Sequence, residues 1–219
     1  MKNPTPKRGI RFWQAALVLG ILVILAAVSL SLANRAAMQS GHYGSCQSNL
    51  KQIMLGVKQY IQDYDEKYPL VASASKVEEG KMLPAFGWAD GIQPYIKSTQ
   101  LYQCPSELRP PGANPTQRHY TDYWFNARLA NKRDEQIEAQ ALTIAFGDGN
   151  DGADATDAHY HLLSVSPKWR NDETSPLFRH TEGANFAFVD GHAKWFAANR
   201  WKSELDLGDH SSFRLKPIN

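Results

Sequence analysis

Three residues near the C-terminal end of the chain have side chains that could bind a metal or transfer a proton. His180, Asp190 and His192 lie in the stretch RHTEGANFAFVDGHAKWF. To share one ion, their ligand atoms must converge to about 2.0–2.2 Å from it. The same stretch alternates aromatic and small residues around Asp190-Gly191, a dipeptide typical of two-residue hairpin turns. One interpretation of these residues is a metal or acid–base site. The interpretation that we favour is a β-hairpin whose polar side chains form hydrogen bonds that tie its ends together.

The acidic, glycine-rich stretch GDGNDGADATDAHYH is a second candidate site. It holds four aspartates spaced three residues apart: Asp148, Asp151, Asp154 and Asp157. Oxygen ligands on a turn-rich loop suit calcium, so calcium is the one candidate cofactor and none is certain. The spacing differs from that of an EF-hand loop, and acidic loops are commonly solvated turns. His159 and His161 would share one face of a strand, which by itself is a weak zinc pattern.

Motifs of common enzyme classes are missing from the sequence. It has no nucleophile elbow, no phosphate-binding loop and no dinucleotide-binding glycine motif, so we expect a protein that is not an enzyme. Four aromatic residues could form an exposed ligand-binding surface: Trp88, Tyr123, Trp124 and Phe125. At this density, aromatic side chains are more often part of a hydrophobic core, which is the interpretation we favour.

The charge distribution argues against a nucleic-acid-binding face. The 24 Lys and Arg residues outnumber the 22 Asp and Glu residues, but five of the basic ones lie within residues 1–40, where no acid occurs. The remaining chain is therefore slightly acidic. A basic patch that binds phosphates gains no support from this balance, and we expect no nucleic-acid partner.

The segment from Phe12 to Asn34 contains no charged residue and reads FWQAALVLGILVILAAVSLSLAN. As a helix it would be about 35 Å long at roughly 1.5 Å per residue, enough to cross a bilayer core of about 30 Å. Basic residues cluster before this span and only Arg35 follows at once, which places the N-terminus in the cytoplasm. A cleaved signal peptide is the alternative, but its apolar region usually has only about 7–15 residues.

Cys46 and Cys104 are the only cysteines of the chain. If the span is a membrane anchor, both lie in the exported part, where the environment is oxidising. We therefore expect a disulfide between them, which would stabilise the fold by roughly 4 kcal/mol in the chain-entropy model. Two separate buried thiols are the alternative.

Apolar residues at helical spacing continue beyond the span. Leu50, Ile53, Met54, Val57, Ile61 and Tyr64 form one stripe. The spacing predicts one long helix up to residue 68, apolar all round at first and on one face later, with Pro69 as its stop signal. The proline-rich part that follows predicts loops, DYWFNARL at 122–129 among them, and four runs further on have the pattern of strands. The fold class expected is α+β, with an antiparallel sheet in the C-terminal half.

Four blocks of the sequence together resemble a protein family. They are CQSNLKQIMLGVKQYIQDYDEKYP at 46–69, WADGIQPYIKSTQLYQCPS at 88–106, TDYWFNARLA at 121–130, and the block at 179–196, in which nine residues separate His180 from Asp190-Gly191. In this order they are similar to the blocks of prepilin-like proteins with a C-terminal H-x9-DG motif. The resemblance implies a pilin-like or pseudopilin-like fold, with a long N-terminal helix packed on an antiparallel sheet.

The resemblance also implies how the chain is organised and processed. Residues 1–9 would be a basic leader-like segment, 10–34 the transmembrane or filament-core helix, 35–68 its amphipathic continuation, and 69–219 the extracytoplasmic sheet domain. A prepilin peptidase would cut between Gly9 and Ile10, and Ile10 would be methylated. Gln14 stands where the family has a glutamate, and an amide cannot neutralise the terminal ammonium of a neighbouring subunit.

Two functions follow as expectations. The first is a structural subunit, minor or at a tip, of a type IV filament or a type II-like secretion system, which assembles through its N-terminal helix in the bacterial inner membrane and is able to reach an extracellular filament after processing. Its partners would be other pilin-like subunits, the prepilin peptidase and an assembly platform. The second is a single-pass anchored protein that binds a ligand outside the cytoplasm and does not polymerise.

Overall fold

The computed structural model describes residues 12–72, 76–78, 81–83, 87–149, 157–180, 182–198 and 200. The chain divides into two compact units, Met1–Met38 and Gln39–Asn219. One helix, α1 (Phe12–Asp63), contributes residues to both of them.

The first part of α1 is apolar and exposed. Within it, the 22-residue segment Trp13–Asn34 is long and apolar enough to cross a membrane, and none of its side chains is buried. An exposed apolar helix near the N-terminus fits a membrane anchor or a signal sequence.

The second part of α1 packs through the predicted stripe. Its side chains Leu50, Ile53, Met54, Val57 and Ile61 are buried, whereas Tyr64 is 52% exposed. The helix ends at Asp63, five residues before the predicted end at residue 68. Asp65 and Glu66 adopt positive φ angles of 52° and 57°. Because this left-handed conformation cannot continue an α-helix, the helix ends before the chain reaches Pro69.

A five-stranded sheet lies in the second unit, in the order β5-β3-β4-β6-β7. The strands are β3 (Tyr123–Asn126), β4 (Ile144–Asp148), β5 (His161–Leu162), β6 (Gly183–Phe188) and β7 (Ala193–Ala197). All neighbours pair antiparallel except β3 and β5, which are parallel. The α+β class with a mostly antiparallel C-terminal sheet is thus confirmed.

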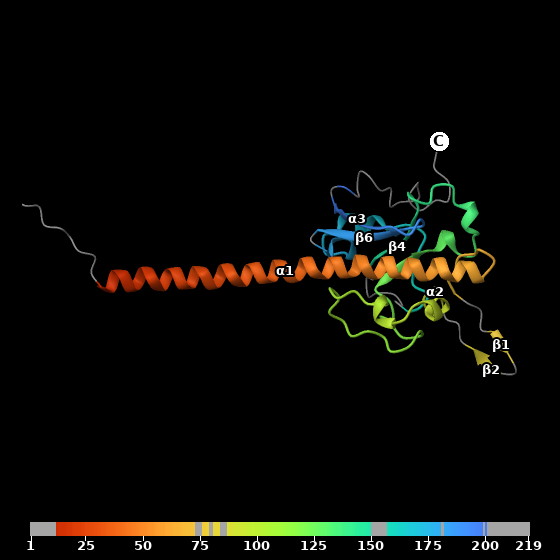
Figure 1. The fold of residues 1–219 in the computed structure, drawn as a ribbon, viewed down its shortest axis with the longest axis horizontal. Coiled ribbons are helices and arrows are strands. Elements are labelled where there is room, and N and C mark those ends of the chain that lie inside the picture. The colour runs from red at the N-terminus through yellow and green to blue at the C-terminus, as the bar shows by residue number, and fades with distance from the viewer. Residues whose placement is uncertain are drawn as a thin grey trace, which may run out of the picture. The chain divides into compact units, whose positions relative to one another are not determined.

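Both faces of the sheet are covered by side chains. Tyr123, Phe125 and Ala187 pack toward the stripe of α1, which runs along the sheet in Figure 1. Trp124 and Phe186 point to the opposite face and pack with residues around α3 (Pro167–Asn171). Because both faces are buried, every residue of β3, β4 and β6 is buried, which explains their near-continuous apolar sequences.

Strand β3 lies in a segment for which the sequence predicted loop. DYWFNARL lacks the simple alternation of a half-exposed strand, since Tyr123, Trp124 and Phe125 are consecutive aromatic residues. The structure accommodates them because alternate rings enter the two separate hydrophobic clusters. The loop prediction was therefore wrong here.

The hairpin of β6 and β7 is confirmed, but its turn is longer than predicted. Phe188 is opposite His192, with the Phe188 N–H donating to the His192 carbonyl at 2.9 Å, so three residues form the loop. The Gly191 N–H donates back to the Phe188 carbonyl at 2.9 Å, and Gly191 has a φ of +97°. A turn followed by a left-handed glycine is the usual three-residue hairpin loop.

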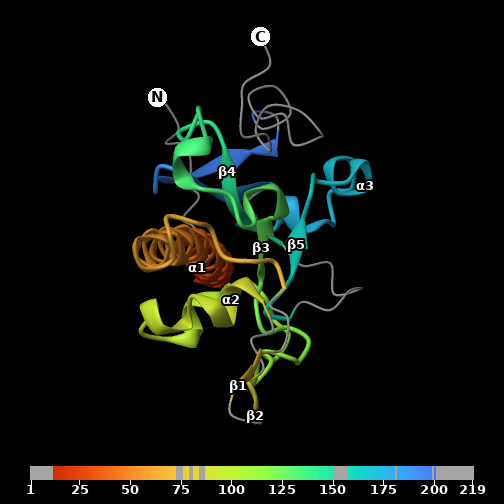
Figure 2. The same ribbon diagram turned by 90° about the vertical axis from the view of Figure 1, so that its right-hand side faces the viewer.

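Short elements complete the second unit. Among the described residues they are the hairpin β1 (Lys76–Glu78) and β2 (Lys81–Leu83), helix α2 (Trp88–Gly91), and the 3-10 turns η1 (Gln93–Tyr95), η2 (Thr99–Tyr102), η3 (Ala127–Leu129), η4 (Asp134–Gln136) and η5 (Pro176–Phe178). Figure 2 shows α2 beside α1, and Trp88 of α2 packs against Phe125 of β3 and Phe146 of β4. Ile92 and Ile96, which follow α2, are buried in the same hydrophobic core as the stripe of α1.

Candidate functional site

Four side chains with metal-binding atoms meet in the interior of the second unit. Cys46, Cys104, Asp148 and His180 each offer one sulfur, nitrogen or oxygen atom, and these atoms lie within 4.8 Å of one another. All four residues are buried. Among the described residues, these four side chains form a group that could hold a metal ion.

Each of the four residues comes from a different element. Cys46 lies on the buried stripe of α1, one turn before Leu50. Cys104 follows η2, and its N–H donates to Asp122 Oδ2 at 2.8 Å. Asp148 ends β4, and His180 precedes β6. The site thus depends on the packing of α1 against the sheet.

His180 is held at both ring nitrogens. Its Nε2 lies 3.2 Å from Asp148 Oδ2 and 3.4 Å from Cys104 Sγ, while its Nδ1 lies 3.3 Å from Ser106 Oγ. The backbone is fixed too, since the His180 N–H donates to the Gly183 carbonyl at 3.0 Å. The Nε2 edge of the His180 ring therefore faces the Asp148 carboxylate and the Cys104 sulfur.

One oxygen of the Asp148 carboxylate is well satisfied and the other is not. Oδ2 accepts hydrogen bonds from the Asn185 backbone N–H at 2.6 Å and from the Asn185 amide at 2.9 Å. Oδ1 is buried and has no hydrogen-bond partner among the described residues. An unpaired buried acceptor is costly, by about 1–3 kcal/mol.

The ionisation of the cluster is strongly shifted. The Cys46 thiol donates to Cys104, and with the help of His180 this lowers the pKa of Cys104 to about 5 despite its burial. The same hydrogen bond, together with burial, raises the pKa of Cys46. Burial alone would lower the pKa of His180, but the neighbouring Asp148 charge prevails and raises it to about 10. These shifts favour a thiolate at Cys104 and an imidazolium at His180.

The predicted disulfide partners are neighbours in the structure. Cys46 and Cys104 are free thiols whose sulfur atoms belong to the four-residue cluster. The fold therefore brings the two cysteines together over a large sequence separation, and a bond between them stays a prediction.

His180, Asp190 and His192 do not converge. The Asp190 Oδ1 is paired with His192 Nδ1 at 2.6 Å on the exposed hairpin loop, and the His192 ring stacks on Phe188. His180 instead faces Asp148 and Cys104. The favoured interpretation holds for Asp190 and His192, which shape the turn, while His180 belongs to a different site.

The aspartates proposed for calcium have separate surroundings where they are described. Asp148 faces the buried cluster, and Asp157 accepts the His159 N–H at 3.1 Å and pairs with His159 Nδ1 at 2.8 Å. Asp151 and Asp154 lie outside the described residues, so the calcium site stays a prediction. His159 lies in the turn before β5, so it does not share a strand face with His161.

The residues of the predicted processing site are described only in part. Gly9 and Ile10 lie outside the described residues. Gln14 is in the first turn of α1, with an exposed side chain.

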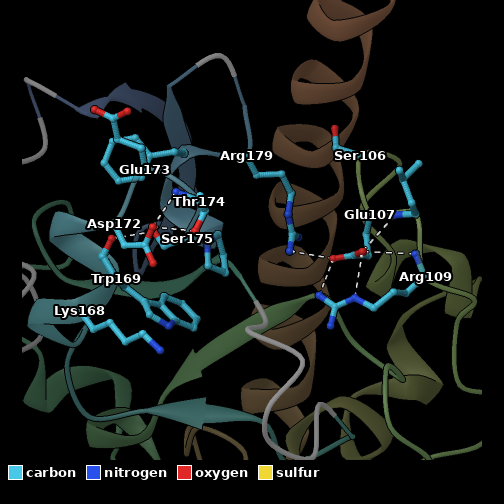
Figure 3. A pocket seen from close by; sticks show the side chains of 13 residues that line it. Ser106, Glu107, Arg109, Lys168, Trp169, Asp172, Glu173, Thr174, Ser175 and Arg179 are labelled. Atoms are coloured by element: carbon cyan, nitrogen blue, oxygen red, sulfur yellow. Dashed lines mark hydrogen bonds and ion pairs between the residues drawn. The ribbon is translucent and has the colours of Figure 1, made fainter.

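A separate pocket of about 500 Å³ opens between the segment after Cys104 and the segment around α3. Figure 3 shows Glu107 between the guanidinium groups of Arg109 and Arg179, each 2.9 Å from Glu107 Oε2. Trp169 lines the pocket from the α3 side. This pocket could not be predicted from the sequence, because Glu107 and Arg179 are far apart along the chain.

We expect Glu107→Gln to destabilise the second unit by about 2–3 kcal/mol at pH 7. Burial opposes ionisation of Glu107, yet Arg109 and Arg179 lower its pKa to about 2, and the amide would leave the 11%-exposed Arg179 poorly compensated. Because this pKa is depressed, the contribution is full above the unfolded value of about 4.5 and is lost as the pH falls toward 2.

Urea unfolding of wild-type and variant protein in mild detergent at pH 7 and pH 3 tests this, and the difference should shrink at the lower pH. Glu135→Gln is the matched control, since Glu135 pairs with Arg133 at the exposed surface and should matter by less than about 1 kcal/mol. Equal effects of the two variants at pH 7 would contradict the prediction.

Comparison with known proteins bears on the part of the chain that carries the two cysteines. Residues 44–130 match a family model. Its description is "Protein of unknown function (DUF1559)", and the family consists of pilin-like and pseudopilin-like proteins. No curated protein and no solved structure matches the chain.

The match covers less than half of the chain. It includes Cys46 and Cys104 and three of the four sequence blocks noted above, but it ends before Asp148 and before the H-x9-DG block. The similarity to a pilin-like family thus has support beyond the sequence blocks themselves, whereas the H-x9-DG motif has no such support.

Proposed function

We propose that this protein is a pilin-like or pseudopilin-like structural subunit, anchored in a bacterial inner membrane by α1 and assembled through this helix into a type IV filament or a type II-like secretion system. The observation that carries the proposal is the division of one 52-residue helix into an exposed apolar part and a part with a single buried stripe. The match of residues 44–130 to a pilin-like family supports it.

The apolar part of α1 requires a partner. Side chains such as Leu19 and Ile24 are 66% and 64% exposed, and exposing them to water carries the full cost of hydrating apolar surface. Lipid satisfies them in the membrane, and apolar helices of other subunits satisfy them in a filament. One helix thus serves as an anchor before assembly and as an assembly element afterwards.

The orientation follows from charge. Lys2, Lys7, Arg8 and Arg11 precede the span, and Arg35 alone follows it closely. The positive-inside bias therefore favours a cytoplasmic N-terminus and an extracytoplasmic second unit. The proposal contains no catalytic step, and its partners are other pilin-like subunits, a prepilin peptidase and an assembly platform.

Gln14 argues for a minor, tip or initiating subunit. In a low-dielectric filament core, a carboxylate at this position would compensate the ammonium of a cleaved neighbour, whereas an amide offers only hydrogen bonds. A subunit at the end of a filament needs fewer such contacts than one in its middle.

Photo-crosslinking in native membranes tests assembly. A photoreactive amino acid at Ile24 should give adducts with a second apolar helix, from this chain or from another single-span protein. The same group at Gln62, which is exposed on the second part of α1, is the control for random collisions. Peptide mass spectrometry of the sheared surface fraction should then find a terminus at a methylated Ile10. An uncleaved chain without helix adducts at Ile24 would overturn the proposal.

An anchored, monomeric ligand-binding protein is the second candidate. The pocket beside Glu107 and Arg179 favours it, because charged groups and Trp169 line a cavity large enough for a small ligand. The aromatic surface considered above does not support it, since Trp88, Tyr123, Trp124 and Phe125 are fully buried. Monomer-only behaviour in the crosslinking experiment would favour this candidate.

A further inference from the structure

We propose that Cys46, Cys104, Asp148 and His180 form a structural zinc site that fastens α1 to the sheet. The donor set is the first argument. Two sulfurs, one imidazole nitrogen and one carboxylate oxygen are the ligand types that zinc takes in tetrahedral structural sites. Thiolate ligands exclude the hard cations calcium and magnesium, which take oxygen ligands.

The spacing of the atoms fits a tetrahedron. Zinc bonds of about 2.3 Å to sulfur and about 2.0–2.2 Å to nitrogen and oxygen imply ligand-to-ligand distances of about 3.3–3.8 Å. The distance from His180 Nε2 is 3.4 Å to Cys104 Sγ and 3.2 Å to Asp148 Oδ2. The whole set lies within 4.8 Å, so closing on an ion requires shifts of about 1 Å or less.

The surroundings hold the ligands as outer-shell groups do in metal sites. Ser106 Oγ is placed to accept from His180 Nδ1–H, which leaves the lone pair of Nε2 for the metal. Asn185 fixes Asp148 through two hydrogen bonds. Asp122 fixes the backbone of Cys104. Three of the four ligands are thus oriented by neighbours that are not ligands themselves.

The second carboxylate oxygen of Asp148 points independently to a ligand. Asp148 is fully buried, and its Oδ1 has no hydrogen-bond partner among the described residues. A cation in the cluster would compensate this charge. A disulfide between Cys46 and Cys104 would use neither Asp148 nor His180 and would leave Oδ1 as it is. A metal site therefore accounts for all four residues, and a disulfide accounts for two.

The net charge of such a site can be compensated. Two thiolates and one carboxylate with Zn²⁺ carry one negative charge, and the largely buried guanidinium of Arg179, the residue before His180, places a positive charge near Cys104 and Asp148. The bound site would thus be close to neutral, as a buried site should be.

The composition of the native protein decides between zinc and a disulfide. The full-length chain is extracted from membranes in mild detergent without chelator or reductant, its zinc is measured by elemental mass spectrometry, and its thiols are alkylated in denaturant and counted by intact mass. We expect about one zinc per chain and two alkylated thiols. A chain about 2 Da lighter, with no alkylation and no zinc, would contain the disulfide and would overturn the proposal.

Reconstitution tests the ligands. The chain is stripped under reducing conditions and titrated with Co²⁺, which should bind at one equivalent, with the intense visible bands of a tetrahedral site and sulfur-to-metal charge transfer. Asp148→Asn and His180→Gln should weaken binding at least 100-fold. Ser106→Ala, which keeps all four ligands, should weaken it about 10-fold.

The matched controls are Asp157→Asn and His192→Gln, the same substitutions at residues outside the cluster. They should bind Co²⁺ as the wild type does, and Asp157→Asn also tests whether the acidic loop contributes. If the ligand variants do not fold, the metal and thiol content of the native chain still decides. Equal binding by all variants would mean an adventitious ion only and would overturn the proposal.

Discussion

Replacing Leu22 and Leu25 together by arginine should release this protein from membranes. Both side chains are 56% exposed and lie three residues apart, on one side of the apolar part of α1. The twelve Leu, Ile, Val and Phe residues between Phe12 and Asn34 each favour insertion by about 0.3–0.6 kcal/mol, or about 4–7 kcal/mol in all. Two arginines near the helix centre cost about 5–7 kcal/mol, so the gain is cancelled.

The measurement is the fraction of the chain that stays in the membrane pellet after alkaline carbonate extraction. It should fall from nearly all to a minority, and Leu22→Arg alone should lower it less. Gln52→Arg with Leu55→Arg is the matched control, with the same spacing on the same helix at two exposed positions of the second unit. A double variant at Leu22 and Leu25 that remains integral would show that α1 is not the anchor.

Trp88→Ala should cost the second unit about 3–5 kcal/mol of unfolding free energy. The ring is fully buried at the start of α2, with its centroid 5.0 Å from that of Phe146 and 5.9 Å from that of Tyr102. Its Nε1–H also donates to the Tyr160 carbonyl at 2.9 Å, so alanine leaves both a cavity and an unpaired buried acceptor.

Thermal unfolding followed by circular dichroism in detergent should show a fall in Tm of about 10 °C. Trp88→Phe keeps most of the ring and loses the N–H, so a smaller fall is expected. Tyr64→Ala removes an aromatic ring that is 52% exposed, and it should change Tm little. An unchanged Tm for Trp88→Ala would contradict the prediction and would indicate that Trp88 is a surface residue available for ligand binding.

The burial of the aromatic residues was predictable from the sequence, whereas strand β3 and the end of α1 were not. The density of aromatic residues predicted a core, and Trp88, Trp124, Tyr123 and Phe125 are buried. The pattern did not reveal β3, because a strand covered on both faces loses its alternation. It also placed the end of α1 too late, since left-handed residues such as Asp65 and Glu66 can end a helix without proline or glycine.

The candidate site lay beyond sequence reasoning for a different reason. His180 was singled out with its sequence neighbours Asp190 and His192, although its partners in space are Asp148 and Cys104. The spacing of the aspartates predicts that Asp148 belongs to the acidic loop that follows it, but as the last residue of β4 it faces the interior. Proximity along the chain was the wrong guide, because strand pairing decides which distant segments meet.

The local and periodic features of this protein can be predicted from its amino-acid sequence. The uncharged span, the stripe of α1, the hairpin around Asp190-Gly191 and the α+β class follow from hydrophobic periodicity and turn chemistry, which act over a few residues. The meeting of Cys46, Cys104, Asp148 and His180, in contrast, is a property of the tertiary structure. Their convergence requires α1, the segment after η2, β4 and the start of β6 to pack at once, and burial of the shared core provides the free energy for that packing.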